Sequence, residues 1–273
     1  MIDILLSAFL LSVILLGIHS YFGLEIIRRG IIFTDLAIGQ MAAFGASLSI
    51  LFLHGDYLYP ISLAFALFGG YTISMISRRE KNPEPFIGLM YAFGLAGVYI
   101  LLSKSAHGME TFQNLMAADI LFTPIEEIIK TGILYAGLGL FIFFFQRKTT
   151  GHLRDILFFV TFAATVTSSV KLAGVLIVFA LLLAPALIAI ILGRGIPLIT
   201  AWIIGTILNI IAIIVSYSFD FPTGYTIVFF NALAALLFNV LCANISKKPQ
   251  CVPGREQEAV DSKQKAVGSR GEL

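Results

Sequence analysis

Residues 28–45 read RRGIIFTDLAIGQMAAFG, a long apolar run that contains a carboxylate and an amide. Two arginines precede the run, Asp35 enters it early, and Gln40 lies about a turn and a half further along. A lipid bilayer offers such groups no hydrogen-bond partners, so a polar side chain inside a membrane segment is by default a functional candidate. The stretch raises two questions: whether the run crosses a membrane, and what its two polar side chains do there.

The composition of the whole chain is that of a membrane protein. Of its 273 residues, 58% are hydrophobic and only 12% are charged, which is about half the charged share of a soluble domain. The net charge of +2 is too small to indicate nucleic-acid binding. Cys242 and Cys251 form neither a disulfide framework nor a zinc-knuckle spacing. We therefore expect lipid to be the main solvent of this chain.

Apolar runs of bilayer-spanning length recur along the chain, separated by short polar segments. The N-terminal run lacks a basic start and a small-residue cleavage site, so we expect it to be a retained span and not a signal peptide. The pattern predicts an all-α, polytopic transmembrane helix bundle of eight or nine spans, because the sixth run is weakened by a Thr/Ser cluster and Lys171. The predicted spans are 3–23, 33–53, 58–76, 86–103, 127–145, 155–171, 173–193, 197–217 and 224–244.

The positive charges of the connecting segments predict the orientation of the bundle. Loops that carry little positive charge alternate along the chain with basic loops. Positively charged loops remain in the cytoplasm, so nine spans place the N-terminus outside and the C-terminus inside. The basic residues of these loops lie at 28–29, 78–81, 147–154, 194 and 247–248.

Two segments are expected to lie outside the bilayer. Residues 104–126 are too long for a simple turn, and IEEI (125–128) predicts a short amphipathic helix at the outer surface. Residues 247–273 are polar and poor in aromatic residues, so we expect a disordered cytoplasmic tail behind a transmembrane domain at 1–246. The chain contains no P-loop, GxSxG or HExxH motif. We expect no catalytic residue, no cofactor and no ATP hydrolysis by the chain itself.

Two interpretations of the polar residues in the opening stretch remain open. Asp35 lies about two residues into its span, so it either caps the helix with Thr34 and pairs with Arg28 or Arg29, or acts on a ligand. Gln40 either makes an interhelical hydrogen bond or contributes to the same ligand path. The two residues are five apart, about 140° around a helix, so they lie on different faces.

Other candidates lie outside this stretch. His107 and Glu110 are three residues apart, so one helical turn would bring them together; a solvated polar loop is the alternative. Pro185 removes a backbone hydrogen bond in the middle of residues 175–192. The freed carbonyl must face protein or water, so we expect this helix to be kinked and interior. His19 is expected at the membrane interface and outside any site.

Several segments, in their order along the chain, resemble the metal-type ABC importer permeases, which serve zinc, manganese and iron(II) importers. The pattern RRxxxFxD from Arg28 to Asp35, with a polar residue five positions before Gly45, is similar to the second span of that family. The resemblance extends over about 1–246. The other similar segments are EPFIGLMYAFG (84–94), SKSAHGME (103–110), MAADILFTPIEEI (116–128), VKLAGVLIVFALLLAPALIA (170–189) and FDFPTGYTIV (219–228).

The resemblance implies a fold of the ABC importer permease type and a multi-pass protein of the bacterial plasma (inner) membrane. It implies a homodimer that works with a separate ABC ATPase subunit and an extracytoplasmic metal-binding protein. The implied substrate is a divalent metal ion, without a choice among zinc, manganese and iron. Asp35 and Gln40 would then line the path of the metal, and His107 and Glu110 would receive it on the outer side.

Two departures from the family pattern keep other functions open. Family members commonly carry His where Gln40 stands, with Asp four residues earlier on the same helix face. They also have a longer segment between the fifth and sixth spans, including a short helix that rests on the ATPase, where this chain has only QRKTTGHLRD (146–155). Either 77–85 or 193–195 takes over that contact, or the chain is a transport-inactive membrane scaffold. A non-ABC secondary carrier or channel is the third possibility.

The charge asymmetry predicts the result of reporter fusions. An enzyme that is active only in the cytoplasm should be active when fused after Lys248 and inactive when fused after Tyr57, because positive loops remain inside. Immunoblots of the two fusions control for expression. The reverse activity pattern would refute the N-out, C-in arrangement.

Overall fold

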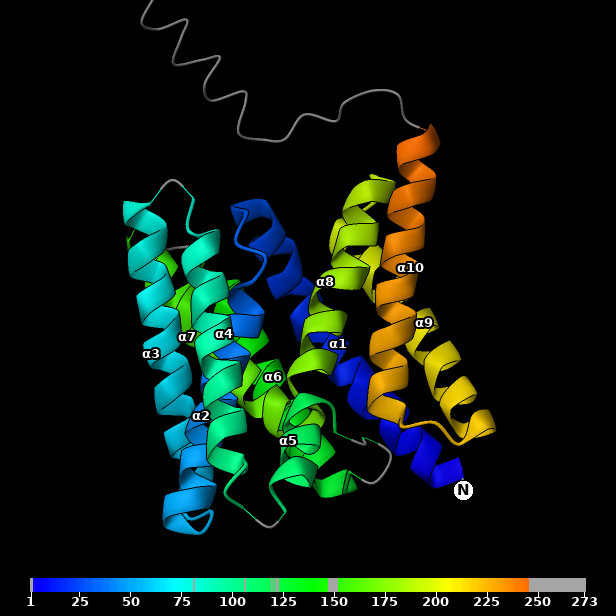
Figure 1. Ribbon diagram of the computed structural model, residues 1–273. Helices are drawn as coiled ribbons and strands as arrows, with labels where there is room; N and C mark the ends of the chain where they lie inside the picture. The colour runs from blue at the N-terminus through cyan, green and yellow to red at the C-terminus, as the bar shows by residue number, and fades with distance from the viewer. Residues whose placement is uncertain are drawn as a thin grey trace, which may run out of the picture.

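The computed structural model describes residues 2–80, 82–105, 107–118, 120, 123–146 and 152–245, so the predicted tail at 247–273 lies outside the described residues. The long elements of the described chain are all helices, which confirms the all-α prediction, and they form one bundle (Figure 1). The elements are α1 (Ile2–Arg29), α2 (Thr34–Leu53), α3 (Leu58–Arg79), α4 (Glu84–Leu102), α5 (Gly108–Met116), α6 (Ile125–Phe141), the π-helical η2 (Ile142–Gln146), α7 (His152–Ala173), α8 (Val175–Leu192), α9 (Pro197–Phe219) and α10 (Thr223–Ile245).

Nine helices in the described part of the chain are long and apolar enough to cross a membrane. The sixth is α7, which continues without a break through the Thr/Ser cluster. Hydroxyl groups in this cluster donate to carbonyl oxygens of their own helix, for example Thr165 to Thr161 at 2.8 Å and Thr167 to Ala163 at 2.8 Å. The polar side chains are therefore satisfied inside the helix, and the described residues contain nine candidate spans, not eight.

Arginine side chains gather at one end of the bundle, which we call the basic end. Successive spans run in opposite directions, so the last turns of α1 and α3 lie at the same end as the first turn of α7 (Figure 1). Ion pairs join these three helices: Arg29 to Asp155 at 2.9 Å, and Arg78 to Asp155 at 3.5 Å. The short helix α5 lies at the opposite end (Figure 1).

The segment between the fourth and fifth spans differs from its prediction. The short helix is α5, residues Gly108–Met116, whereas IEEI (125–128) forms the first turn of the spanning helix α6. The prediction of a short surface helix at IEEI is therefore wrong. Pro124 immediately precedes α6, and two acidic residues in the first turn, Glu126 and Glu127, suit the positive end of the helix dipole.

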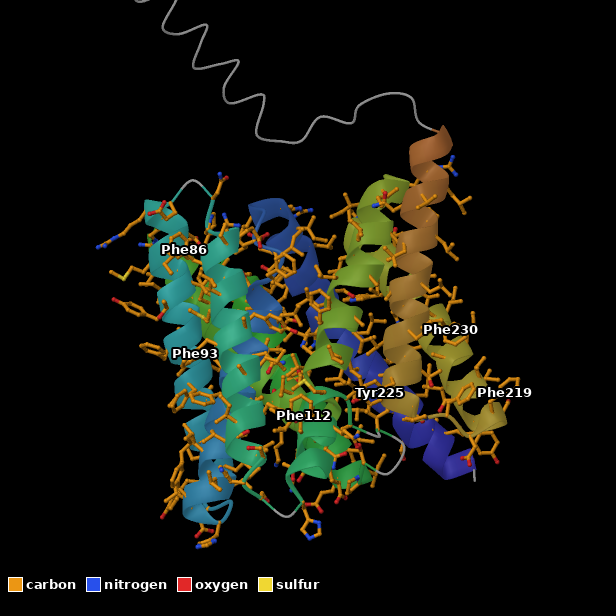
Figure 2. All side chains as sticks on the ribbon, viewed as in Figure 1. Phe86, Phe93, Phe112, Phe219, Tyr225 and Phe230 are labelled. Carbon is orange, nitrogen blue, oxygen red and sulfur yellow. The ribbon has the colours of Figure 1, made fainter. Side chains whose placement is uncertain are left out.

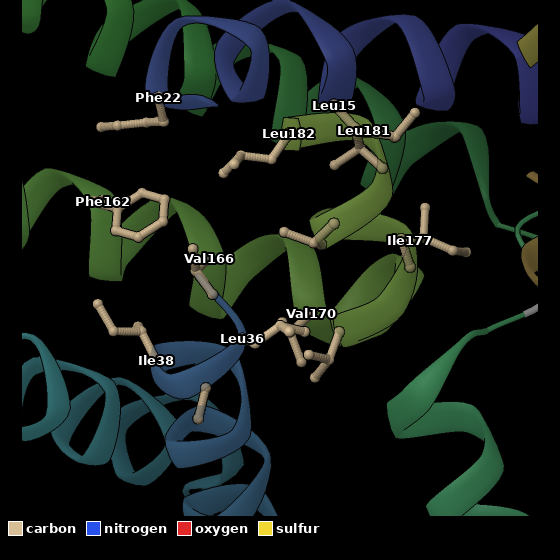
Figure 3. Close-up of a cluster of buried hydrophobic side chains, with 14 of the residues drawn as sticks. Leu15, Phe22, Leu36, Ile38, Phe162, Val166, Val170, Ile177, Leu181 and Leu182 are labelled. Atoms are coloured by element: carbon tan, nitrogen blue, oxygen red, sulfur yellow. The ribbon is translucent and has the colours of Figure 1, made fainter. Parts of the chain in front are cut away.

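Helices α2, α7 and α8 form the interior of the bundle. Two-thirds of the apolar stretch of α2 and of α7 is buried (67% each), and 61% of that of α8, against 22% in α4, α6 and α10. Helix α2 packs against α3, α4 and α7, and α8 packs against α1, α9 and α10. Figure 3 shows the apolar cluster in which α1, α2, α7 and α8 meet. Its labelled members are Leu15, Phe22, Leu36, Ile38, Phe162, Val166, Val170, Ile177, Leu181 and Leu182.

Large apolar side chains cover the outside of the bundle, as expected for a protein dissolved in lipid. Phe86 and Phe93 of α4 are 47% and 61% exposed, and Phe219 at the end of α9 is 66% exposed (Figure 2). A soluble protein rarely exposes such continuous apolar surface. The exterior therefore agrees with the composition.

Glycines let the neighbouring helices approach α2 closely. A Cβ atom added at Gly94 of α4 would lie 2.8 Å from Gln40 Cβ, and one added at Gly97 would lie 2.6 Å from Phe44 Cε2. On another side, a Cβ at Gly45 would lie 2.8 Å from the carbonyl oxygen of Ile61 in α3. Such contacts are typical of helix packing in membranes, where small residues permit close backbone approach. Helix α2 is thus tightly packed between α3 and α4.

These contacts predict different effects for two glycine substitutions on the same helix. Gly94→Ala should lower the stability of the bundle by about 1–3 kcal/mol, because the new methyl group overpacks the contact with Gln40. Gly88→Ala is the matched control, since nothing lies within 4 Å of the added Cβ. Thermal melting of the purified protein in detergent measures both. Equal melting temperatures for the two variants would contradict the close α2–α4 contact.

Candidate functional site

Asp35 lies in the first turn of α2 and is only 1% exposed. Neither of its carboxylate oxygens has a hydrogen-bond partner among the described residues. The N-cap residue of α2 is Phe33, and no side chain caps the helix. Arg29 pairs instead with Asp155 at 2.9 Å and with Glu25 at 3.3 Å. The interpretation of Asp35 as a helix cap with an arginine partner is therefore wrong.

Gln40 is fully buried, and only one side of its amide group is satisfied. Its Nε2 donates to the sulfur of Met116 at 3.5 Å, which is a weak interhelical bond because thioether sulfur is a poor acceptor. Its Oε1 has no partner in the described part of the chain. Gly94 lies against the Cβ of Gln40, so α4 closes one side of this residue.

Four buried side-chain oxygens on α2 thus lack a hydrogen-bond partner among the described residues: the two carboxylate oxygens of Asp35, Oε1 of Gln40 and Oγ1 of Thr34. Most buried polar atoms in proteins have a partner, so an exception requires an explanation. Carboxylate and amide oxygens are ligands that hard divalent cations accept. The chemistry of α2 therefore fits brief contact with a cation, although five residues separate the two side chains.

The end of α5 carries Met116 and is anchored between other helices. Ala118 donates its amide to the carbonyl of Ala173 at 2.9 Å. Gly174, with φ +85°, lies so close to the backbone of Met116 that an added Cβ would approach it to 2.7 Å. A Cβ at Gly224 would likewise collide with the carbonyl oxygen of Ala118. The junction between α7 and α8 therefore fixes the backbone that holds Met116 beside Gln40.

His107 and Glu110 are neighbours, as their spacing predicted. They do not lie with Asp35 and Gln40 of α2. Nδ1 of His107 lies 3.8 Å from Oε2 of Glu110 at the start of α5. Their side chains are 85% and 74% exposed, whereas Asp35 and Gln40 are buried. The four predicted residues thus form two separate groups. No cluster of three or more His, Cys, Asp or Glu side chains suited to a metal occurs in the described residues.

Pro185 lies inside α8 and is buried, as predicted for an interior helix. It packs against α9, because a Cβ added at Gly205 would lie 3.0 Å from Pro185 Cγ. A Cβ at Gly23 of α1 would overlap the carbonyl oxygen of Leu182, one turn before the proline. Glycines of α1 and α9 therefore allow these helices to pack closely against α8 near the proline, where a backbone hydrogen bond is missing.

A buried hydroxyl network around His19 was not expected from the sequence. His19 is fully buried, so its assignment to the membrane interface is wrong. Its Nδ1 donates to the carbonyl of Leu15 at 2.7 Å, and its Nε2 lies 3.2 Å from Oγ of Ser169. Tyr135 bonds to Ser168 at 2.9 Å and also to Ser169. His19 and Arg29 are ten positions apart, a rise of about 15 Å, and this spacing was the signal that places the histidine deep in its span.

The fold of this chain is shared with proteins of known structure. The model of the ABC 3 transport family matches residues 1–242. The chain belongs to this family. Its similarity to a probable metal transport system membrane protein of Thermotoga maritima is 25% identity over 185 residues, covering 62% of this chain and 66% of the relative.

Other relatives of this ABC 3 family chain are uncharacterized membrane proteins. One from Cyanophora paradoxa is 26% identical over 210 residues, with 67% of this chain and 69% of the relative covered. PsaBC from Streptococcus pneumoniae, solved in complex with Fab, superposes with a TM-score of 0.72 at 19% identity, over 86% of this chain and 90% of that chain. An inward-facing putative metal-chelate type ABC transporter superposes with a TM-score of 0.63 at 17% identity, over 88% and 85%. These structures share the fold, which is that of an ABC permease.

The packing around Pro185 predicts a selective loss of function in a member of this family. Pro185→Leu restores the backbone hydrogen bond and removes the ring that fits against Gly205, so the variant should insert normally but show reduced transport. Pro197→Leu is the matched control, because a proline in the first turn of α9 interrupts no helical bond. Metal uptake by cells, normalised to protein in the membrane, measures both. Unchanged uptake in Pro185→Leu would show that the proline serves packing alone.

Proposed function

We propose that the chain is the membrane-spanning permease subunit of an ABC importer for divalent metal ions: zinc, manganese or iron. Membership in the ABC 3 transport family supports a permease, and the description of the Thermotoga maritima relative supports a metal substrate. In this proposal a separate ABC ATPase subunit supplies the energy, and an extracytoplasmic protein delivers the metal. Two copies of the chain form a homodimer in the bacterial plasma membrane, with N-termini outside and C-termini in the cytoplasm.

The observation that carries the proposal is the unpartnered oxygen chemistry of α2. An ionisable side chain inside a spanning helix is costly and is by default a functional candidate. Both oxygens of Asp35 and Oε1 of Gln40 lack donors among the described residues. A passing divalent cation supplies the positive charge that these oxygens lack. An amide binds zinc less well than imidazole does, and weak binding suits a permease because the ion must also leave.

The positions of the other candidate residues suggest the order in which a metal ion would meet them. His107 and Glu110 are exposed at the end of the bundle that carries α5, where a delivered cation first meets the chain. Met116, at the other end of α5, accepts a weak hydrogen bond from Gln40. Asp35 follows in the first turn of α2, nearer the basic end. The metal would thus pass from His107 and Glu110 along α2 toward the cytoplasm.

A transport-inactive membrane scaffold is the second candidate, and a specific observation favours it. Helix α7 begins at His152, so only five residues separate it from η2, which ends at Gln146. That connection is shorter than the ATPase contact of the family permeases. In the importer proposal another part of the basic end, such as the turn between α3 and α4, takes this role. The ion pairs of Arg78 and Arg29 with Asp155 support an ATPase contact at the basic end, because they join α3, α1 and α7 at that end.

Substitutions in α2 test the importer proposal directly. Asp35→Asn should reduce metal uptake about tenfold or more, because a carboxylate beside a divalent ion in a partly dry path is worth several kcal/mol. Gln40→Leu should reduce uptake less, since it removes a weak hydrogen bond and no charge. Neither variant should change insertion.

The control is Asp56→Asn, which removes an exposed carboxylate from the loop that follows α2. Uptake of zinc, manganese and iron(II) is measured in cells that carry the chain with its ATPase and binding protein, normalised to protein in the membrane. If Asp35→Asn and Asp56→Asn both retain near-normal uptake, the cation path along α2 is wrong. An absence of uptake by the unaltered chain with all its partners would instead support the scaffold.

A further inference from the structure

A half-open groove with a volume of about 860 Å³ lies between α1, α6 and α9. Its floor is the face of α1 that carries Gly17, and its walls include Gly139 and Phe143 on one side and Trp202 on the other. Phe143 and Trp202 are 52% and 41% exposed, so the groove faces the surroundings of the bundle and not its core. Its volume lies in the range of sites that bind ligands of a few tens of atoms.

Small residues keep this groove open. Nothing lies within 4 Å of a Cβ atom added at Gly17 or at Gly139. The indole of Trp202 donates from Nε1 to the carbonyl oxygen of Gly17 at 3.0 Å, which holds the ring at the rim. The two glycines and the Trp202 hydrogen bond therefore define the shape of the groove. Asp35 and Gln40 of α2 are not among its lining residues.

The groove extends through about half of the membrane thickness, on the side of the basic end. Along α6 and η2 its lining runs from Gly132 to Phe143, a rise of about 16 Å. The hydrocarbon core of a bilayer is about 30 Å thick, so this length corresponds to one leaflet. Arg154, in the first turns of α7, lines the end of the groove at the basic end.

Charge distinguishes this end of the groove from the rest. The Arg154 side chain is 50% exposed and lies 3.6 Å from Glu25. Glu25 also pairs with Arg29, which pairs with Asp155, as does Arg78. Of these groups Arg154 lines the groove, and it is the one charged side chain among the described lining residues. A groove with an apolar body and a cation at the membrane surface matches a lipid with an anionic headgroup.

We propose that this groove binds an anionic glycerophospholipid of the leaflet at the basic end, with an acyl chain along α1 and α6 and the headgroup phosphate at Arg154. The proposal concerns a site outside the metal path and does not depend on transport. The lipid fills the space between α6 and α9, both of which pack against α1. It thereby joins two helices at the edge of the bundle.

The chain contains a single tryptophan, Trp202, at the rim of this groove, so its fluorescence reports directly on the occupant. The full chain is reconstituted in vesicles that contain equal mole fractions of acyl-brominated phosphatidylglycerol or acyl-brominated phosphatidylcholine, since bromine quenches indole on contact. Quenching by the anionic lipid should reflect about fivefold preferential binding, the factor typical of one basic side chain at a membrane surface. Equal quenching by the two lipids would overturn the proposal.

Two matched pairs of variants locate the effect. Arg154→Gln should abolish the preference for the anionic lipid, and Arg79→Gln, at the same end of the bundle but outside the groove, should keep it. Gly139→Leu fills the groove and should reduce quenching by both lipids, whereas Gly137→Leu, a neighbour outside the lining, should not. Equal effects of the two arginine variants would indicate general surface charge and contradict the site. Absence of quenching by either lipid would show that something else covers the groove, such as a second copy of the chain.

Discussion

A lipid bilayer offers no hydrogen-bond partner, and most of this structure depends on that constraint. Hydroxyl groups of α7 turn back to carbonyls of their own helix. Asn231 of α10 donates to Asn209 of α9 at 3.1 Å, which joins two helices that are otherwise mostly exposed to lipid. His19 likewise finds partners on its own helix and on α7. Against this background, Asp35 stands out because both oxygens of its buried carboxylate lack a hydrogen-bond partner among the described residues.

Close packing explains how the fold keeps these oxygens in place. Helix α2 is enclosed by α3, α4 and α7, and glycines on α2 and α4 bring the backbones together. Gln40 is held on one side by Gly94 and on another by the sulfur of Met116. Met116 in turn depends on the backbone of Ala118, which is bonded to the junction of α7 and α8. The end of α5 and the buried polar residues of α2 are thus parts of one packed unit.

The basic end has a different organisation, because its charges reach water and headgroups. Arg29, Arg78 and Asp155 join α1, α3 and α7 through ion pairs, which are worth little individually at an exposed surface but restrict one another as a network. Arg154 belongs both to this network, through Glu25, and to the lateral groove. A lipid headgroup and an ATPase would therefore act on the same group of helices, although at different faces.

The sequence by itself determined the class of fold and most limits of the long apolar helices, because the thickness of the bilayer demands about 20 apolar residues per span; it left the number of spans at eight or nine. It also identified α8 as interior from Pro185, since lipid cannot accept the freed carbonyl. Local pattern placed His19 at an interface, which was wrong, and left a helix cap open as one of two interpretations of Asp35, which the structure excludes. Only the tertiary structure decided which helices are central, that Met116 meets Gln40, and that Arg154 ends a groove. These facts depend on contacts between residues that are far apart in the sequence, in some cases by more than a hundred positions. Helix periodicity does not encode such contacts.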